Sequence, residues 1–449
     1  MFTGKQLRSL IIPLVIEQLL SVLVGTMDIM MVSQVGEFAT SGVSLVDNVT
    51  NLLIQAFSAM ATGGSVVAAH YMGRKETKQA SDSAIQLCVA NTVIGLAIML
   101  GCLLGGRALL GLIYGTIEQD VMEAAVIYFM ITCVSYPFFA LYSAGTALCR
   151  AERNSNITMK VAIIVNIINV GGNALLVLGF KMGTAGVAIP TLVSRAFGAG
   201  AMMVILSKEN QPIHFAKGVP YRFNWTMTKR IMKIGIPTGI DGSIFQVGRV
   251  LVGSLTSTLG TVAIAANAVC NTFQGILCIP GAAMGLALIT IVGQCLGAGE
   301  KEQAISYTKK VMGAIHLAAF GMALFVFLFH PALLKLYNLS GPTYDLAREI
   351  LIVYAVVGFI IWPPSFSLAN ALRAGGDASF IMVISISSMW IFRVGLSYVA
   401  VYVLQLGLQG IWYAMYCDWI FRAVIFIARF VSRKWIKLLP NKEKETAES

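Results

Sequence analysis

Four polar side chains stand in otherwise apolar stretches of the sequence, and together they have the chemistry of a cation site. Asp28 lies deep in the apolar run GTMDIMM. Asn169 and Asn173 are four residues apart, so they share one face of a helix. Thr191 follows Pro190, which kinks or opens a helix and frees backbone carbonyls. Such carboxylate, amide and hydroxyl oxygens suit a hard cation such as sodium, whereas a carboxylate in a semi-dry cavity can instead hold a proton.

Each of these residues also has a structural interpretation. Asp28 could be an acid held by hydrogen bonds at a helix contact, and a single asparagine more often bonds to a neighbouring helix than binds a ligand. An ionisable group at bilayer depth costs about 2.5 kcal/mol or more, so its presence requires a reason. We therefore hypothesise that a cation, sodium or a proton, binds at Asp28 with Asn169, Asn173 and Thr191 around it.

Two further acids and an arginine form a second candidate group. Glu17 and Asp241 each follow a proline by four residues, and Glu17 precedes Asp28 by eleven residues. Eleven residues are about three helical turns, or roughly 16 Å, along nearly the same face. Together with Arg249, which lies eight residues after Asp241, the acids could form a proton route or part of a cavity wall. The alternative is structural ion pairing, with Arg249 as the expected partner of Glu17 or Asp241.

Prolines mark interrupted helices in corresponding regions of the two halves of the chain. Pro137 and the pair Pro363-Pro364 are such interruptions, and they point to a central cavity. Methionines re-pack around varied ligands, although ordinary packing or lipid contact is the alternative for any one of them. The side chains that we expect in the cavity wall are Met27, Met31, Tyr136 and Trp362.

The composition is that of a membrane protein. The chain is 57% hydrophobic and 12% charged, with a mean hydropathy of +0.78, whereas a soluble domain carries about 25% charged residues. Apolar runs long enough to cross a bilayer lie near 10–33, 50–72, 85–106, 125–148, 158–180, 186–206, 234–257, 263–291, 306–329, 349–370, 380–404 and 409–428. We predict an all-α polytopic membrane protein with twelve transmembrane helices in two six-helix bundles.

The two halves read as copies of one unit with an offset of 224 residues. Matched pairs include Pro13 and Pro237, Gly36 and Gly260, and Gly73 and Gly297. An even number of spans per copy places the pseudo-twofold axis along the membrane normal, and transporters commonly bind substrate where repeats meet. The expected parts are an N-terminal bundle (1–206), a cytoplasmic linker (207–229), a C-terminal bundle (230–435) and a cytoplasmic tail (436–449).

The candidate cation site is not repeated in the second copy. The equivalents of Asp28, Asn169, Asn173 and Thr191 are Val252, Arg393, Ser397 and Met415. An arginine and two apolar side chains cannot form an oxygen-rich pocket, so a cation site of this type belongs to the N-terminal half.

The charge distribution predicts the orientation of the chain. When connections are assigned alternately from the N-terminus, one side holds only Arg107, Lys181, Lys335 and Arg348, and the other holds the remaining loop lysines and arginines. The positive-inside rule then places both termini in the cytoplasm. The net charge of +11 therefore reports topology and contact with anionic lipid, and no basic face with interleaved aromatic residues suggests a nucleic-acid partner.

Several classes of function are disfavoured. The sequence has no GxxxxGK[ST] loop, no HExxH among its four histidines and no CxxC among its eight cysteines. We therefore expect no enzyme, no cofactor and no metal centre apart from the coupling ion. The charged start and the apolar segment after it lack a small-residue cleavage site, so we interpret this segment as a retained first helix.

The chain resembles the multidrug and toxic compound extrusion (MATE) transporters, from a superfamily that also contains lipid-linked oligosaccharide flippases. The resemblance spans residues 5 to 435. It rests on VGTMDIMMV at 24–32, AHYMGRK at 69–75 and its echo QCLGAG at 294–299, the segment 147–156, GTAGVAIPT at 183–191, and ALRAGGD at 371–377.

The resemblance implies roles for the polar residues. In family members the acid matching Asp28 is the coupling site, and the residues matching Asn169, Asn173 and Thr191 surround it. Some members carry aspartate where this chain has Asn173. Some also place a glutamate in the seventh helix and an aspartate in the tenth, where this chain has Phe245 or Gln246 and Trp362.

The resemblance implies export of cationic or amphipathic organic compounds across the bacterial inner membrane, by antiport against sodium or protons. The sequence does not choose between the two ions, and it does not name the substrate. A flippase for a lipid-linked precursor is the alternative, which would need a more basic cavity to hold pyrophosphate. A channel or receptor is a third class. Two internal repeats indicate that a monomer can function.

Overall fold

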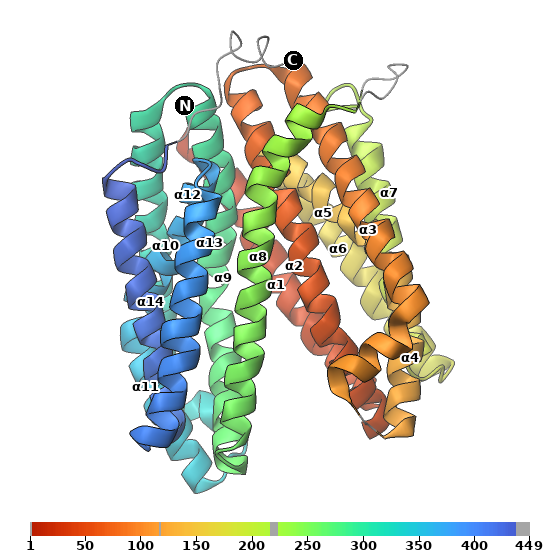
Figure 1. Cartoon of the computed structure of the whole chain (residues 1–449), viewed down its shortest axis with the longest axis vertical. Helices are drawn as coiled ribbons and strands as arrows, with labels where there is room; N and C mark the ends of the chain where they lie inside the picture. The colour runs from red at the N-terminus through yellow and green to blue at the C-terminus, as the bar shows by residue number, and fades with distance from the viewer. Residues whose placement is uncertain (1, 116–117, 216–222, 437–449) are drawn as a thin grey trace. The chain divides into compact units, whose positions relative to one another are not determined.

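The computed structural model describes residues 2–115, 118–215 and 223–436, and all regular structure in these ranges is helical (Figure 1). Short π-helical segments are marked η. The first helices are α1 (Gly4–Ser33), α2 (Glu37–Gly73), α3 (Thr77–Tyr114), α4 (Gln119–Val134), α5 (Tyr136–Ala151), α6 (Ser155–Asn173), η1 (Ala174–Gly179) and α7 (Ala185–Leu206). The later helices are α8 (Trp225–Ser257), α9 (Thr261–Gly297), α10 (Lys301–Lys335), α11 (Gly341–Trp362), η2 (Pro363–Ser367), α12 (Leu368–Ala374), α13 (Ala378–Ser388), η3 (Met389–Leu396), η4 (Val399–Val403) and α14 (Gly407–Val431).

The twelve predicted spans correspond to helices, some of them continued by a π-helical segment. In the described ranges, nine helical stretches are long and apolar enough to cross a membrane, and the bent pair α4–α5 makes a tenth. The other two predicted spans are α8 and α14, which carry charged side chains within the helix. The predicted all-α membrane fold with twelve spans is confirmed.

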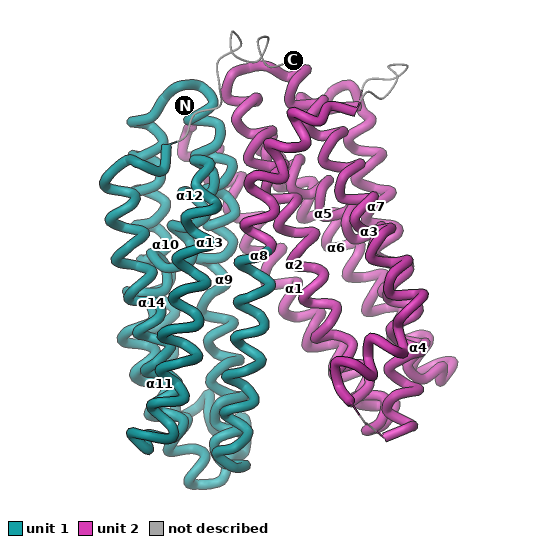
Figure 2. The backbone as a smooth tube through the Cα atoms, viewed as in Figure 1, with its two compact units in different colours: residues 1, 240–448 teal, residues 2–239, 449 magenta. Residues whose placement is uncertain are grey.

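The described chain forms two compact units, which Figure 2 colours separately. The N-terminal unit is Phe2–Gly239 and the C-terminal unit begins at Ile240, so the division falls inside α8. The first turns of α8 pack closely on α2, because a Cβ on Gly63 would lie 2.5 Å from the carbonyl oxygen of Ile231. The domain limits drawn from the sequence stay a prediction, and residues 216–222 of the linker and 437–449 of the tail lie outside the described ranges.

The interrupted helices are observed at the predicted prolines. Helices α4 and α5 meet at Ser135 with a bend of 48°, and Pro137 lies in the first turn of α5. Gly95 of α3 allows close approach there, since a Cβ at this position would lie 2.8 Å from the Cα of Pro137. In the C-terminal unit, Pro363 and Pro364 begin the π-helical segment η2. The prediction of broken segments in both halves is confirmed.

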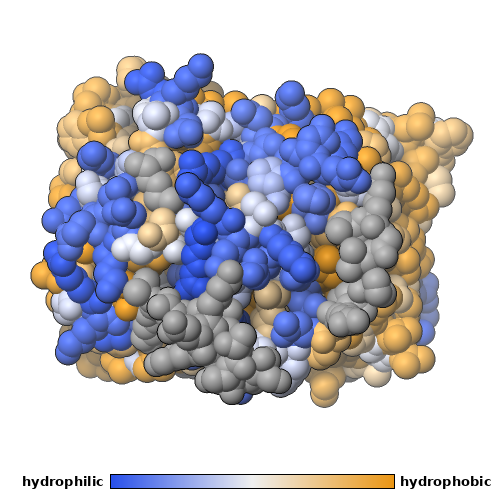
Figure 3. Space-filling view, turned by 90° about the horizontal axis from the view of Figure 1, so that it is seen from above, coloured by the Kyte–Doolittle hydropathy of each residue, from blue (hydrophilic) through white to orange (hydrophobic). Residues whose placement is uncertain are grey.

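Polar and apolar residues are separated on the surface. Hydrophilic residues gather over most of the face seen in Figure 3, and hydrophobic residues follow the rim of that view. Many large apolar side chains on the helices are exposed, among them Leu104, Leu112 and Val403. This pattern is expected of helices that contact lipid along their sides and water at their ends.

A buried acid follows the end of α5. Glu152 is 8% exposed, and its Oε2 accepts a hydrogen bond of 3.2 Å from the backbone N–H of Ile213. Its Oε1 has no hydrogen-bond partner among the described residues. Burial raises the pKa of Glu152 from 4.5 to about 7, although the hydrogen bond from Ile213 opposes the rise. The folded state therefore binds this proton more tightly than the unfolded state does.

Glu152→Gln should change how the stability of the folded chain depends on pH. The contribution of the protonated acid is fully present below pH 4.5 and is lost as the pH rises through about 7. The wild-type chain should lose up to about 3 kcal/mol more than the Gln variant between pH 5 and pH 8. Thermal unfolding of both proteins across this range measures the difference. Parallel pH profiles would contradict the prediction.

Candidate functional site

Asp28 and Asn173 meet between α1 and α6, which pack against each other. The side-chain Nδ2 of Asn173 donates a hydrogen bond of 2.7 Å to Oδ1 of Asp28. Asn173 is the last residue of α6, directly before the π-helical segment η1, and it is completely buried. Asp28 is half-buried and has no ion-pair partner among the described residues. The carboxylate is therefore held by a neutral amide and stays partly accessible.

Asn169 and Thr191 form a second contact, one helical turn away on α6. The Nδ2 of Asn169 donates to Oγ1 of Thr191 at 3.1 Å, and Thr191 donates to the carbonyl oxygen of Val187 at 3.1 Å. The Oδ1 atoms of Asn169 and Asn173 are buried and have no hydrogen-bond partner in the described part of the chain. The two amide oxygens lie on adjacent turns of α6, and together with the Asp28 carboxylate of α1 they are ligands that a hard cation prefers.

Asp47 and Arg195 add charge to this site, and neither is among the candidate residues drawn from the sequence. Oδ1 of Asp47 accepts a hydrogen bond of 3.2 Å from the hydroxyl of Tyr128. Asp47 and Arg195 both act electrostatically on Asp28. Arg195 also donates a hydrogen bond of 2.7 Å to Oγ of Ser135. Two carboxylates and one guanidinium give the site an excess of negative charge when both acids are ionised.

Asp47 was not among the predicted site residues because the predicted start of the second span was too late in the sequence. The sequence places the second span at 50–72, but α2 begins at Glu37, so Asp47 lies within the helix. Gly36, with a φ of 134°, is the N-cap. A glycine can adopt this conformation, and an acid after it is favourable in the first turn of a helix. The sequence does contain this signal for a helix start, as Gly36 followed by Glu37.

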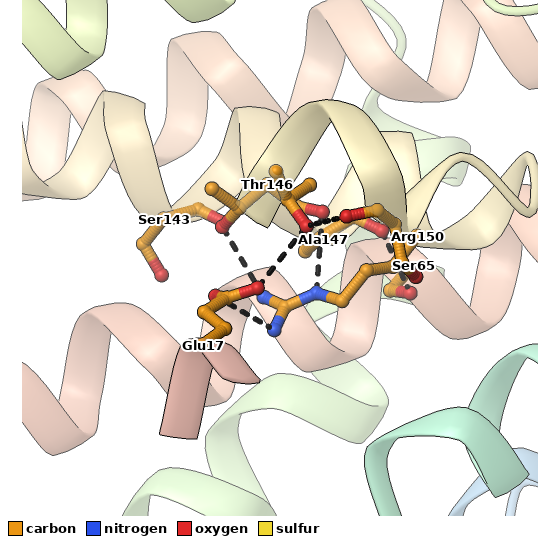
Figure 4. Close-up of polar contacts among 8 residues, drawn as sticks. Glu17, Ser65, Ser143, Thr146, Ala147 and Arg150 are labelled. Atoms are coloured by element: carbon orange, nitrogen blue, oxygen red, sulfur yellow. Dashed lines mark hydrogen bonds and ion pairs between the residues drawn. The ribbon is translucent and has the colours of Figure 1, made fainter. Parts of the chain in front are cut away.

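Glu17 and Asp241 pair with arginines, but not with Arg249. Figure 4 shows the Glu17 carboxylate beside Arg150 of α5, with an N–O distance of 3.7 Å. Thr158 also donates to Glu17 at 3.1 Å. In the C-terminal unit, Arg373 of α12 pairs with Asp241 at 2.6 Å.

The two halves therefore contain the same kind of ion pair, which agrees with the structural alternative for both acids. The expectation that Arg249 neutralises either acid is wrong. The partners come from the matched segments around Arg150 and Arg373, which lie far away in sequence. Arg249 has no ion-pair partner in the ranges that the structure describes, and it lines a pocket in the C-terminal unit.

The residues assigned to a cavity wall lie in different environments. Tyr136 is completely buried in the core of the N-terminal unit, and its hydroxyl lies 3.1 Å from Oγ1 of Thr50, so its assignment to a cavity wall is wrong. Trp362 stacks on Phe366 with ring centroids 5.4 Å apart. Met27 is 45% exposed and Met31 is half-buried. A role in substrate contact stays a prediction for Trp362 and both methionines.

Comparison with known proteins identifies the family. The MatE family model matches residues 13–175 and again residues 237–399. The two matches begin 224 residues apart, which is the offset of the sequence repeat, and together they cover more than half of the chain. The chain belongs to the MatE family.

Relatives of this MatE protein match it along almost its whole length. The uncharacterized transporter YisQ of Bacillus subtilis is 28% identical over 439 residues, which cover 96% of this chain and 95% of YisQ. The probable multidrug resistance protein NorM of Thermotoga maritima is 25% identical over 442 residues, 96% of this chain and 93% of NorM. A solved outward-facing structure of a multidrug resistance MATE family transporter superposes with a TM-score of 0.89 at 18% identity, covering 96% of this chain and 95% of that one.

The MatE assignment settles the class of protein. Members of this family are membrane transporters of the multidrug efflux type, and they are not enzymes. The MatE protein described here is accordingly a multi-span transporter.

Proposed function

We propose that this chain is a secondary active exporter of cationic or amphipathic organic compounds, driven by inward movement of sodium or a proton. The observation that carries the proposal is the contact between Asp28 and Asn173 inside the N-terminal unit. Relatives named as probable multidrug resistance proteins support small organic substrates. The transport cycle is alternating access, in which the site opens to each side of the membrane in turn.

Asp28, Asn169, Asn173 and Thr191 would hold the coupling ion. Sodium would take a carboxylate oxygen of Asp28 and the free amide oxygens of the asparagines, whereas a proton would neutralise Asp28 itself. We propose that a cation entering from outside binds here, shifts α1 and its neighbours, and promotes substrate release. Such coupling requires that the cation bind the two states of the transporter with different free energies.

The setting of this transport is the bacterial cytoplasmic membrane, with both termini in the cytoplasm and a monomer as the working unit. The excess of basic residues on one side of the sequence supports that orientation and contact with anionic lipid.

Fluorescent-dye efflux from cells that express the chain tests the proposal. The sodium and proton gradients are collapsed separately, and efflux should stop when the coupling gradient is removed. Efflux that survives collapse of both gradients would contradict ion-driven antiport and favour a channel.

A flippase for a lipid-linked precursor is the second candidate function. One observation favours it, because Arg249 and Arg393 line the same pocket in the C-terminal unit and could meet a phosphate group. A flippase should transfer lipid-linked substrate between leaflets and should not export the dye.

A further inference from the structure

A pocket with two arginines lies inside the C-terminal unit, and the coupling mechanism does not use it. We call it the arginine pocket. It has a volume of about 90 Å³ and lies among α8, α9, η3 and α14. Its polar lining includes Arg249, Asn267, Asn271 and Arg393, and its apolar lining includes Trp412 and Met415.

The positive charge in this pocket lacks a matching acid. Arg249 has no ion pair in the described ranges, and Nε of Arg393 is buried without a hydrogen-bond partner there. The acid that acts on Arg393 is Asp418, whose Oδ1 accepts hydrogen bonds from Arg422 and Ser388. One carboxylate thus acts on two guanidinium groups, those of Arg393 and Arg422, and Arg249 adds a further positive charge that acts on Arg393. A charged side chain in a membrane span is costly unless it has a partner, so this excess indicates an anion that binds from outside the chain.

The arginine pocket is the repeat counterpart of the cation site. Adding 224 residues to Asp28, Asp47, Asn169 and Thr191 gives Val252, Asn271, Arg393 and Met415. All four of the resulting residues line the pocket. The two acids of the N-terminal site are replaced by an apolar side chain and an amide, and one asparagine is replaced by arginine. The same place in the repeat therefore carries the opposite charge.

We propose that the arginine pocket binds the carboxylate or phosphate group of an amphipathic organic compound. The guanidinium fork matches both groups, because it can donate two parallel hydrogen bonds to a pair of oxygens. Oδ1 of Asn267 already accepts a hydrogen bond of 3.1 Å from Nε1 of Trp412, which leaves the Asn267 amide N–H groups to donate.

The size of the pocket limits what it takes. Drug-sized ligands occupy pockets of roughly 300–1,000 Å³, so a volume of about 90 Å³ accepts the anionic end of a molecule and not the whole of it. Trp412 and Met415 offer apolar surface to the carbon atoms next to that group. The inference rests on the proposed function for its transport role, where it extends the substrates to anionic and zwitterionic compounds.

Binding to the purified full-length chain tests the proposal. Benzoate and phenyl phosphate are titrated by calorimetry, with neutral benzamide and cationic benzylamine as matched controls. Both anions should bind at least about tenfold more tightly than benzamide, since charge-assisted hydrogen bonds to arginine are lost with the neutral analogue. Equal affinity for benzoate and benzamide would overturn the proposal.

Variants locate the binding to this pocket. Arg249→Gln and Arg393→Gln should each weaken benzoate binding by at least about tenfold. Arg348→Gln, which changes an exposed arginine of α11, should leave the affinity unchanged. Arg249 is itself exposed, so its variant should fold even if the Arg393 variant does not. Unchanged benzoate affinity in folded Arg249→Gln would contradict the assignment.

The anion that binds could be a lipid headgroup or a soluble compound, and a change of lipid distinguishes the two. Phenyl phosphate binding is compared in nanodiscs of phosphatidylcholine and of phosphatidylglycerol. Competition by phosphatidylglycerol that Arg249→Gln removes would identify a lipid headgroup as the ligand, and equal binding in both would identify a soluble anion. If the wild-type chain binds benzoate but does not export the dye, the result counts against the proposed antiport alone. If it exports the dye but does not bind benzoate, the result counts against the arginine pocket alone.

Discussion

Proteoliposomes that contain the Asp28→Asn variant are expected to show a fall of about 5- to 150-fold in ion-driven substrate accumulation, the range of a typical coupling free energy. The asparagine keeps the shape of the side chain, and its Oδ1 can still accept the hydrogen bond that Asn173 donates in the wild-type chain. It cannot carry a negative charge or exchange a proton. Coupling should therefore be lost while the fold is retained.

The control for this variant is Asp345→Asn, which changes an exposed acid of α11. Both variants are reconstituted at equal density, and uptake is measured with a sodium gradient and with a proton gradient imposed separately. The gradient that drives the wild-type chain identifies the coupling ion. Full accumulation by Asp28→Asn under that gradient would refute coupling at this carboxylate.

The sequence was most informative where one periodicity or one repeat decides the answer. Helical spacing placed Asn169 and Asn173 on one face, and the structure joins one to Thr191 and the other to Asp28. The apolar runs predicted the spans because lipid requires long unbroken stretches of apolar residues. These features depend on local sequence and on composition.

Features that depend on distant pairs could not be predicted in this way. Arg373 and Asp241 are 132 residues apart, and nothing local indicates that they meet. Asp47 was missed because the apolar run that defines a span does not show how far its helix extends beyond the bilayer core. An arginine without an ion-pair partner in the described ranges, such as Arg249, is recognised only when all of its neighbours in the structure are known.

The interior of the C-terminal unit contains a fully buried ion pair whose loss should be severe. Asp418 is 0% exposed and Arg422 is 3% exposed, and their Oδ1 and Nε atoms lie 2.8 Å apart on α14. Ser388 also donates to Asp418, and Arg422 donates to the carbonyl oxygen of Ser385 at 3.0 Å. The guanidinium further lies 5.3 Å from the ring of Phe245.

Asp418→Ala should lower the free energy of unfolding by about 3–5 kcal/mol, because it leaves the Arg422 charge buried without its partner. The corresponding fall in Tm is about 3–5 °C for a chain of 449 residues that unfolds cooperatively, measured by tryptophan fluorescence on the purified chain. Glu302→Ala is the matched control. It breaks the pair with Arg433, whose side chains are 71% and 58% exposed, and should change stability by less than about 1 kcal/mol.

The double variant Asp418→Leu with Arg422→Met distinguishes the charge from the packing. It removes both charges and keeps apolar volume, so it should recover most of the stability that Asp418→Ala loses. If the double variant is as unstable as the single one, the hydrogen bonds to Ser385 and Ser388 hold this region together, and the unpaired charge is not the cause. If Asp418→Ala has the same Tm as Glu302→Ala, Asp418 does not compensate the charge of Arg422. The positive charge near the arginine pocket is then larger than the contacts of Asp418 suggest.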